Sequence, residues 1–260
     1  MLNLSSAYLV LNSPLEQFEI VSFLNISAPI LGYFNLALTN LGLYSLIVLF
    51  LVLSLHLVGN NEGKLVPSFW SISLESSFAS IHSMVRSQIG SANERYLPFI
   101  YSLFFFILIS NLVSNVPYSY SLTTSLIVSL GLSFTIFIGV TILGLYKHQI
   151  NFFSYFIPAG TPLGLVPLLV LIEFISYLAR AFSLGVRLFA NLTAGHTLLK
   201  ILSGLLSQLF TSGILMFFIT LIPFAIFVAL CGLEIAVSVI QAYVFCILTC
   251  SYLKDAIDLH

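Results

Sequence analysis

Long apolar runs, separated by short polar segments, dominate the chain. A helix of about 20 apolar residues, rising about 1.5 Å per residue, crosses a hydrocarbon core of about 30 Å. Runs of this length predict membrane spans at residues 36–58, 97–116 and 122–145. Only five residues, Pro117 to Ser121, separate the last two runs, so these two spans are expected to form an antiparallel hairpin.

Two runs nearer the C-terminus are much longer than one span. Between Pro167 and Pro223 there is no proline, which predicts helices at residues 168–208 and 213–253, the second bent near Pro223. Each would be about 60 Å long, roughly twice the thickness of the hydrocarbon core. Such helices tilt far from the membrane normal or break. We therefore expect a strongly tilted hairpin, preceded by an irregular loop at 158–167 that is rich in proline and glycine.

Residues 67–90 show a different pattern. Their apolar residues recur at helical spacing with serines mainly between them, at Leu74, Phe78, Ile81, Val85 and Ile89. This predicts an amphipathic helix that lies either in the membrane interface or against the rest of the chain. Residues 1–35 contain Pro14 and Pro29 and are expected to form short interfacial structure.

Together these elements predict an all-α, polytopic membrane protein with a single membrane domain over residues 1–260. It would have about five membrane-embedded helices and one amphipathic surface helix. Composition agrees, because 59% of the residues are hydrophobic and only 7% are charged, whereas about a quarter are charged in a soluble domain. A net charge of −1 argues against binding to nucleic acid, which needs a basic face.

Cysteines and the N-terminal charge pattern add little. Cys231, Cys246 and Cys250 lie in the apolar C-terminal run and are interpreted as small buried residues rather than as metal ligands or a disulfide. The first 63 residues contain no Lys or Arg, so the charged start of a secretory signal is missing. The sequence does not decide whether a short leader precedes Ser13.

Basic residues predict the orientation, since they gather on one side of a membrane. They occur near the ends of predicted elements, at Lys64, Arg86, Arg95, Lys147 and Lys254. Five crossings place all of them on one side. The N-terminus and the 117–121 turn, which have none, fall on the other side. In a mitochondrion the basic side would be the matrix.

Arg187 is the most unusual residue, because it lies inside a segment apolar enough to sit in lipid. Arginine does not lose its charge in proteins, and a charge at the bilayer centre costs roughly 2.5–3.5 kcal/mol. Glu173, Arg180 and Arg187 are seven residues apart, so they share one helical stripe, and Asn191 lies close to it. His196, nine residues beyond Arg187, is expected on the opposite face.

The second long helix carries a matching polar face. Glu234, Ser238 and Gln241 share one side of it, and Asp255 continues this side near the basic end. Buried ion pairs that hold the two helices together would explain part of this set. Membrane interiors, however, rarely carry so many ionisable groups unless an ion moves through them. Lys200 could simply extend to the interface.

The polar set divides by position along the helices. Glu173, Arg180 and Asp255 lie towards the basic ends. A second group lies beyond the middle, at Asn191, His196, Glu234 and Gln241. Two groups of titratable and amide side chains with a fixed cation between them indicate two aqueous half-paths for protons that do not join.

The same residues carry a family resemblance. SLGVRLFANLTAGH and GLEIAVSVIQAYVFCILTCSYLKDA closely resemble the a subunits of F-type ATP synthases in their mitochondrial form. IPAGTPLGLVPLLVLIEFISYLAR, LGLYKH and SPLEQFEI resemble the fungal version. The resemblance covers nearly the whole chain. It implies that the tilted hairpin packs against a rotating ring of c subunits and that Arg187 faces the essential carboxylate of the ring.

The resemblance also implies roles for the other polar residues. It assigns the half-channel from the intermembrane space to Asn191, His196, Glu234 and Gln241, and the matrix half-channel to Glu173 and Asp255. From their positions in the chain, Arg180 and Ser238 are expected to support these residues. Some bacterial relatives have an acid where this chain has His196 and a histidine where it has Glu234. That exchange keeps one acid and one imidazole in the path.

Further expectations follow from the resemblance. The chain would lie in the mitochondrial inner membrane, with its N-terminus in the intermembrane space and its C-terminus in the matrix. Its partners would be the c ring, the peripheral stalk, other small membrane subunits, lipid and, in dimers of the whole complex, a second complex. It would transport H+, use no cofactor and be no enzyme by itself.

Two other functions fit an apolar chain with intramembrane charges. A self-contained secondary ion transporter is the main alternative, but such proteins often show paired halves with interrupted helices, and the two halves here do not repeat each other. An intramembrane hydrolase is the second alternative. No HExxH motif is present to support it.

Overall fold

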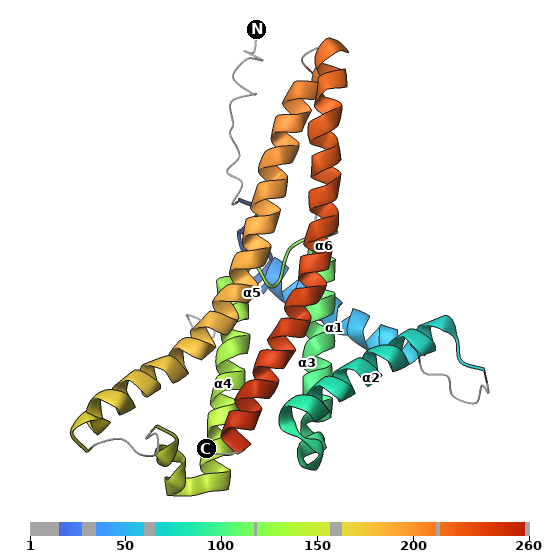
Figure 1. Cartoon of the computed structure of the whole chain (residues 1–260). Helices are drawn as coiled ribbons and strands as arrows, with labels where there is room; N and C mark the ends of the chain where they lie inside the picture. Colours follow the sequence, from blue (N-terminus) through green and yellow to red (C-terminus); the bar gives the residue numbers. More distant parts are fainter. Residues whose placement is uncertain are drawn as a thin grey trace.

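The computed structural model of the chain describes residues 16–27, 35–59, 66–116, 119–156, 163–211 and 214–257 (Figure 1). Its six α-helices in this part of the chain are α1 (Asn40–Gly59), α2 (Phe69–Ile89), α3 (Leu97–Ser114), α4 (Leu126–His148), α5 (Val166–Thr211) and α6 (Ile214–Ile257). All except α2 are long and apolar enough to cross a membrane. The chain is therefore an all-α, polytopic membrane protein, as its pattern predicts.

The N-terminal part contains a small element that the pattern did not predict. The short 3-10 helix η2 (Glu16–Phe18) comes first in the chain. Strands β1 (Ser22–Ser27) and β2 (Asn35–Thr39) follow it and form an antiparallel pair. Residues 36–39, expected inside the first span, belong to β2 instead. Asn40 sets this boundary, because its side chain donates to Glu19 O at 2.9 Å and accepts from Val21 N at 3.3 Å.

Helix α2 has one face against the chain and one face free. Its N-cap Ser68 accepts a hydrogen bond from Ser71 N at 3.3 Å, and Gly90, with φ of 90°, ends it. Its second half is buried at Ile81, Met84, Val85 and Ile89. Its first residues, Phe69 and Trp70, are exposed. Contact with the rest of the chain thus explains half of the amphipathic pattern, and the exposed half suits a membrane interface.

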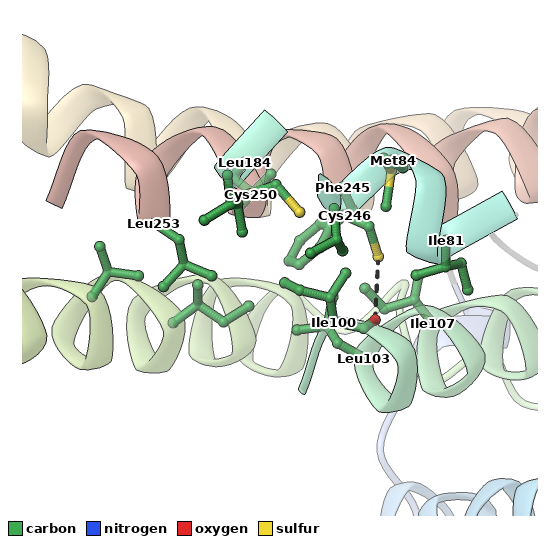
Figure 2. Close-up of a cluster of buried hydrophobic side chains, with 14 of the residues drawn as sticks. Ile81, Met84, Ile100, Leu103, Ile107, Leu184, Phe245, Cys246, Cys250 and Leu253 are labelled. Carbon is green, nitrogen blue, oxygen red and sulfur yellow. Dashed lines mark hydrogen bonds between the residues drawn. The ribbon is translucent and has the colours of Figure 1, made fainter. Parts of the chain in front are cut away.

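The core lies where α2 and α3 meet α6 (Figure 2). Phe245, Cys246 and Cys250 of α6 are completely buried there. The Cys246 thiol points to Ile100 O in α3, at 3.9 Å. Burial of these two thiols among aliphatic side chains supports their interpretation as small apolar residues.

Helices α5 and α6 form a long hairpin that extends beyond the other helices (Figure 1). Helix α6 continues through Pro223. Helix α5 begins at Val166, so Pro167 lies in its first turn, where no intrahelical partner is needed for its nitrogen. Of the irregular loop expected before it, residues 158–162 lie outside the described residues. Residues 163–165 form the short 3-10 helix η6 (Leu163–Leu165), and residues 166 and 167 already belong to α5.

Small residues bring α4 and α5 together. A Cβ on Gly185 would come within 2.9 Å of the Leu130 side chain and 3.0 Å of Ser129 O. The Ser133 hydroxyl donates to Ala181 O. Glycine at 185 is therefore needed for the close approach of the two helices, as is common between membrane helices. Of the expected 117–121 turn, Pro117 and Tyr118 lie outside the described residues.

Candidate functional site

Arg187 points away from the helices that hold it in place. Its neighbours Leu184, Gly185 and Leu188 are buried, whereas Val186 and Arg187 are exposed. Among the residues that the structure describes, no hydrogen bond or ion pair of Arg187 is found. The buried neighbours fix the rotation of α5, so the guanidinium is presented at the outer face of the molecule.

Asn191 and Gln241 connect α5 to α6 next to Arg187. Asn191 Nδ2 donates to Gln241 Oε1 at 2.9 Å. Gln241 is buried, whereas Asn191 lies on the exposed side of α5, one turn beyond Arg187. The sequence placed these two amides in one group, and the structure brings them into direct contact.

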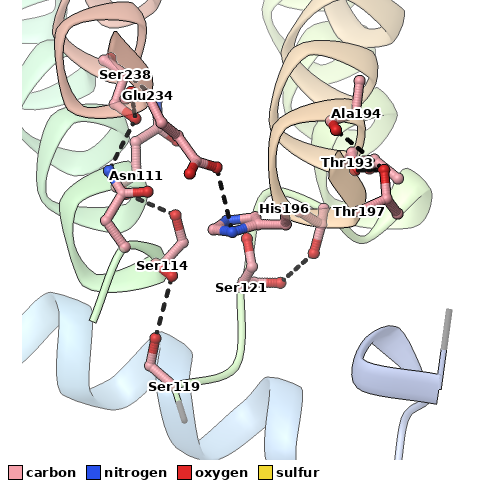
Figure 3. Close-up of polar contacts among 12 residues, drawn as sticks. Asn111, Ser114, Ser119, Ser121, Thr193, Ala194, His196, Thr197, Glu234 and Ser238 are labelled. Carbon is pink, nitrogen blue, oxygen red and sulfur yellow. Dashed lines mark hydrogen bonds and ion pairs between the residues drawn. The ribbon is translucent and has the colours of Figure 1, made fainter. Parts of the chain in front are cut away.

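His196 and Glu234 form a close pair of titratable groups between the two helices (Figure 3). His196 Nδ1 lies 3.2 Å from Glu234 Oε1, and the two side chains are only 15% and 10% exposed. Gly195 makes this approach possible, because a Cβ there would come 2.8 Å from Glu234 Oε1. His196 therefore faces α6, while Arg187 on the same helix faces outward.

A cavity of about 740 Å³ adjoins this pair. It lies between α1, the α3–α4 connection and the two long helices, and its polar lining comes from Gln17, Asn40, Tyr44, Ser114, Asn115, Ser119, Tyr120, Lys200 and Ser203. Burial raises the pKa of the Tyr120 phenol, so it stays neutral in this lining. A cavity of this size with so many polar groups can hold many water molecules in contact with His196 and Glu234. Lys200, which had no clear role in the sequence, is part of this lining.

A buried polar network holds α6 against α3 beside Glu234 (Figure 3). Ser238 is its centre: its hydroxyl donates to Glu234 O at 2.9 Å and accepts from Asn115 Nδ2 at 3.2 Å. Asn111 Nδ2 donates to Ser238 O at 3.3 Å, and Thr123 Oγ1 donates to Asn111 Oδ1 at 3.0 Å. The sequence indicated Ser238 but not Asn111, Asn115 or Thr123. Asn111 and Asn115, two amides inside the predicted 97–116 span, were the available signals.

The second polar group gathers around Arg180. Arg180 Nη1 lies 3.1 Å from Asp255 Oδ2, and Arg180 Nη2 lies 3.6 Å from Glu173 Oε1. The three side chains are between 30% and 35% exposed. Tyr252 OH adds a hydrogen bond to Arg180 O at 3.4 Å. Arg180 therefore holds together the two acids that the sequence placed near the basic end.

The two groups lie on either side of Arg187 along α5. Arg180 comes seven residues before Arg187, a helical rise of about 10 Å, and His196 comes nine residues after it, a rise of about 13 Å. These separations exceed the reach of a direct hydrogen bond. The fold thus keeps the acids at Arg180 apart from the His196–Glu234 pair, with an exposed cation between them.

Comparison with known proteins places the chain in a family. The model of the family described as ATP synthase A chain matches residues 42–254. The chain is 68% identical over 251 residues to ATP synthase subunit a of Mycosarcoma maydis, an alignment that covers 96% of this chain and 99% of the relative. It is 53% identical to the protein of that name from Emericella nidulans, covering 95% and 97% of the two chains. For Kluyveromyces lactis the identity is 50%, and the coverage is 97% and 99%.

Identity at this level over nearly the whole length of both chains leaves no large part of the protein outside the match. The five long apolar helices are also those of a membrane-sector subunit. The chain belongs to the ATP synthase A chain family and is a membrane subunit of the proton-transporting F-type ATP synthase.

Proposed function

We propose that this chain provides two offset half-channels for H+ and that Arg187 separates them and couples proton flow to the rotation of a ring of c subunits. The observation that carries this proposal is the position of Arg187, exposed on α5 between two separate polar groups. A fixed charge at a lipid-facing surface costs several kcal/mol unless it is paired at least part of the time. The partner is a carboxylate on the neighbouring ring.

The first half-channel begins at the cavity of about 740 Å³. Water in it delivers protons to the His196–Glu234 pair, which joins an imidazole to a carboxylate at 3.2 Å. The Asn191–Gln241 amide pair lies between this pair and the outer face at Arg187. Amides do not titrate in this range, so their role is to orient water towards the ring carboxylate.

Protonation of the ring carboxylate makes its rotation through lipid inexpensive, because a neutral acid avoids the cost of a bare charge in hydrocarbon. After nearly a full turn the carboxylate reaches the second half-channel and loses its proton towards Glu173 and Asp255. Arg180 holds both of these acids in place along this path. The charged carboxylate is then drawn to Arg187.

Arg187 also prevents a direct leak between the half-channels. Its charge repels a proton that would pass from the His196 side to the Arg180 side without the ring. Moving one proton across 100 mV releases about 2.3 kcal/mol, so several protons are needed for each ATP. The chain itself holds no cofactor and catalyses no bond-breaking step in this mechanism.

The location and partners follow from this role. The chain lies in the mitochondrial inner membrane, with its N-terminus in the intermembrane space and its C-terminus in the matrix. The basic residues Arg95, Lys147 and Lys254 then mark the matrix side. Besides the c ring, the peripheral stalk and small membrane subunits contact its outer faces, which carry many exposed apolar side chains.

An Arg187→Ala variant tests the proposal. In resealed membrane vesicles that contain the intact complex, ATP-driven proton pumping is expected to be lost. Arg86→Ala is the matched control, because Arg86 is also exposed but lies on α2, 3.9 Å from Glu94. Pumping by Arg187→Ala at the wild-type proton-to-ATP coupling would overturn the proposal. A self-contained transporter would instead conduct protons as a purified single chain, where this chain is expected to be inert.

A further inference from the structure

A narrow groove of about 290 Å³ runs between α3 and α4, away from the polar groups described above. Helices α3 and α4 each pack against α6 rather than against each other, which leaves this furrow between them. Its lining is almost entirely apolar: Phe99, Leu103, Leu132, Ile136, Val140, Leu143 and Leu253. The Thr135 hydroxyl, also in the lining, donates to Leu132 O of its own helix at 2.8 Å. The groove therefore offers water almost nothing to bind.

Gly139 creates the middle of the groove. It lies in the lining, and a Cβ built on it would meet no other atom within 4 Å. The space is thus a missing side chain on the α4 wall. Both walls belong to helices long and apolar enough to cross the membrane, so the groove opens towards hydrocarbon.

The size of the groove limits what can occupy it. One turn of an α-helix is a cylinder about 10 Å wide and about 5.4 Å high, which amounts to about 420 Å³. The groove, with about 290 Å³, holds less than one such turn. A whole turn of a partner helix does not fit in it, whereas a segment of one narrow, flexible acyl chain does.

Two basic side chains lie at one end of the groove. Arg95 Cζ lies 5.8 Å from the ring centre of Tyr96, which lines the groove. Lys147 lies one helical turn beyond Leu143 on the same face of α4, and its ammonium donates to Ile257 O at 3.0 Å. Within the described parts of the chain, neither Arg95 nor Lys147 is paired with a carboxylate.

We propose that this groove binds one acyl chain of an anionic phospholipid, whose phosphate lies near Arg95 and Lys147. The two cations lie at the end where α3 begins and α4 ends, which is the end with the basic residues. Basic groups beside a cleft between membrane helices are the arrangement that anionic headgroups prefer. The lipid fills the groove between α3 and α4, which share no extensive contact of their own. It thereby stabilises the packing of both helices on α6.

Photolabelling of the intact ATP synthase tests this site. The complex is placed in phosphatidylcholine nanodiscs that contain a small fraction of a lipid probe with a photoreactive acyl chain. The probe is either phosphatidylglycerol, which is anionic, or phosphatidylcholine, which is zwitterionic. The amount of probe attached to peptides from residues 97–114 and 126–148 is then measured. The anionic probe is expected to label these peptides about fivefold more strongly than the zwitterionic probe, the effect of roughly one nearby cation.

Variants separate the acyl chain from the headgroup. Gly139→Leu fills the groove and is expected to remove most of the labelling by both probes. Gly131→Leu is its matched control, because Gly131 is also on α4 with no atom within 4 Å of its Cβ position but does not line the groove. Arg95→Gln is expected to reduce the preference for the anionic probe and to leave labelling by the zwitterionic probe unchanged.

Either of two results would overturn the proposal: equal labelling by both probes in the wild-type complex, or undiminished labelling in Gly139→Leu. If Gly139→Leu does not assemble, the comparison of the two probes on the wild-type complex still decides. Proton pumping serves as the assembly check and is expected to be normal in Gly131→Leu.

Discussion

Arg180 Nη1 lies 3.1 Å from Asp255 Oδ2, so an ion pair connects α5 to the last turns of α6, 75 residues away in the chain. The same guanidinium lies 3.6 Å from Glu173 Oε1. Arginine suits this position, because its planar group presents several donors in fixed directions to two carboxylates at once. The arrangement makes Arg180 the organiser of the proposed matrix half-channel.

Replacing Arg180 is expected to slow proton release more than it destabilises the chain. Arg180→Gln leaves Glu173 and Asp255 without their shared cation, so the two carboxylates lose the group that positions them for proton transfer. Because these side chains are about a third exposed, their coupling energy is expected to be on the order of 1 kcal/mol. ATP-driven pumping in vesicles measures the rate. A cycle with Asp255→Asn measures the coupling, and strictly additive effects would show that the pair is not coupled.

The His196–Glu234 pair is expected to tolerate exchange but not deletion. His196→Ala removes one member of a pair held 3.2 Å apart and should slow proton conduction by about a hundredfold, the lower range for a positioned acid–base group. The double variant His196→Glu with Glu234→His keeps an acid and an imidazole in contact. It should recover much of the lost rate. A double variant as slow as His196→Ala would show that conduction needs each group at its own position.

Gly195 is expected to be needed for the spacing of this pair. In Gly195→Ala the new Cβ would lie 2.8 Å from Glu234 Oε1, so the carboxylate must move. Gly204→Ala on the same helix is the matched control, because its Cβ would meet nothing within 4 Å. Both variants gain roughly 0.5–1 kcal/mol of helix propensity. Only Gly195→Ala should lose proton conduction, and equal conduction by the two variants would contradict the role of Gly195.

Asn111 is expected to stabilise the packing of α3 on α6. Its side chain is completely buried and bonds both Thr123 and Ser238. Asn111→Leu leaves these partners unsatisfied, at a cost of about 1–3 kcal/mol. A lower melting temperature of the purified complex is the expected result. Ser102→Ala, which removes an exposed hydroxyl bonded only within α3, should leave the melting temperature unchanged.

Local patterns were sufficient to locate the helices. The length of an apolar run and its periodicity act within a few turns, so all five spans and the amphipathic helix lie close to the predicted positions. One exception is residues 122–125, which were expected inside a span but precede α4. The other is residues 36–39, where a strand precedes the first helix because Asn40 bonds the backbone of residues 19 and 21. That contact joins parts of the chain that no local window covers.

By itself, the sequence determined the class of the protein and its helices. It also predicted a role for Arg187, because a charge in an apolar run is costly wherever the run is placed. It also placed His196 and Arg187 on opposite faces, since the helical repeat is a local property. Only the tertiary structure decided which groups meet: His196 with Glu234, Asn191 with Gln241, and Arg180 with both Glu173 and Asp255. These contacts depend on the relative rotation and offset of α5 and α6. Many weak contacts set that geometry together, including the close approaches at Gly185 and Gly195.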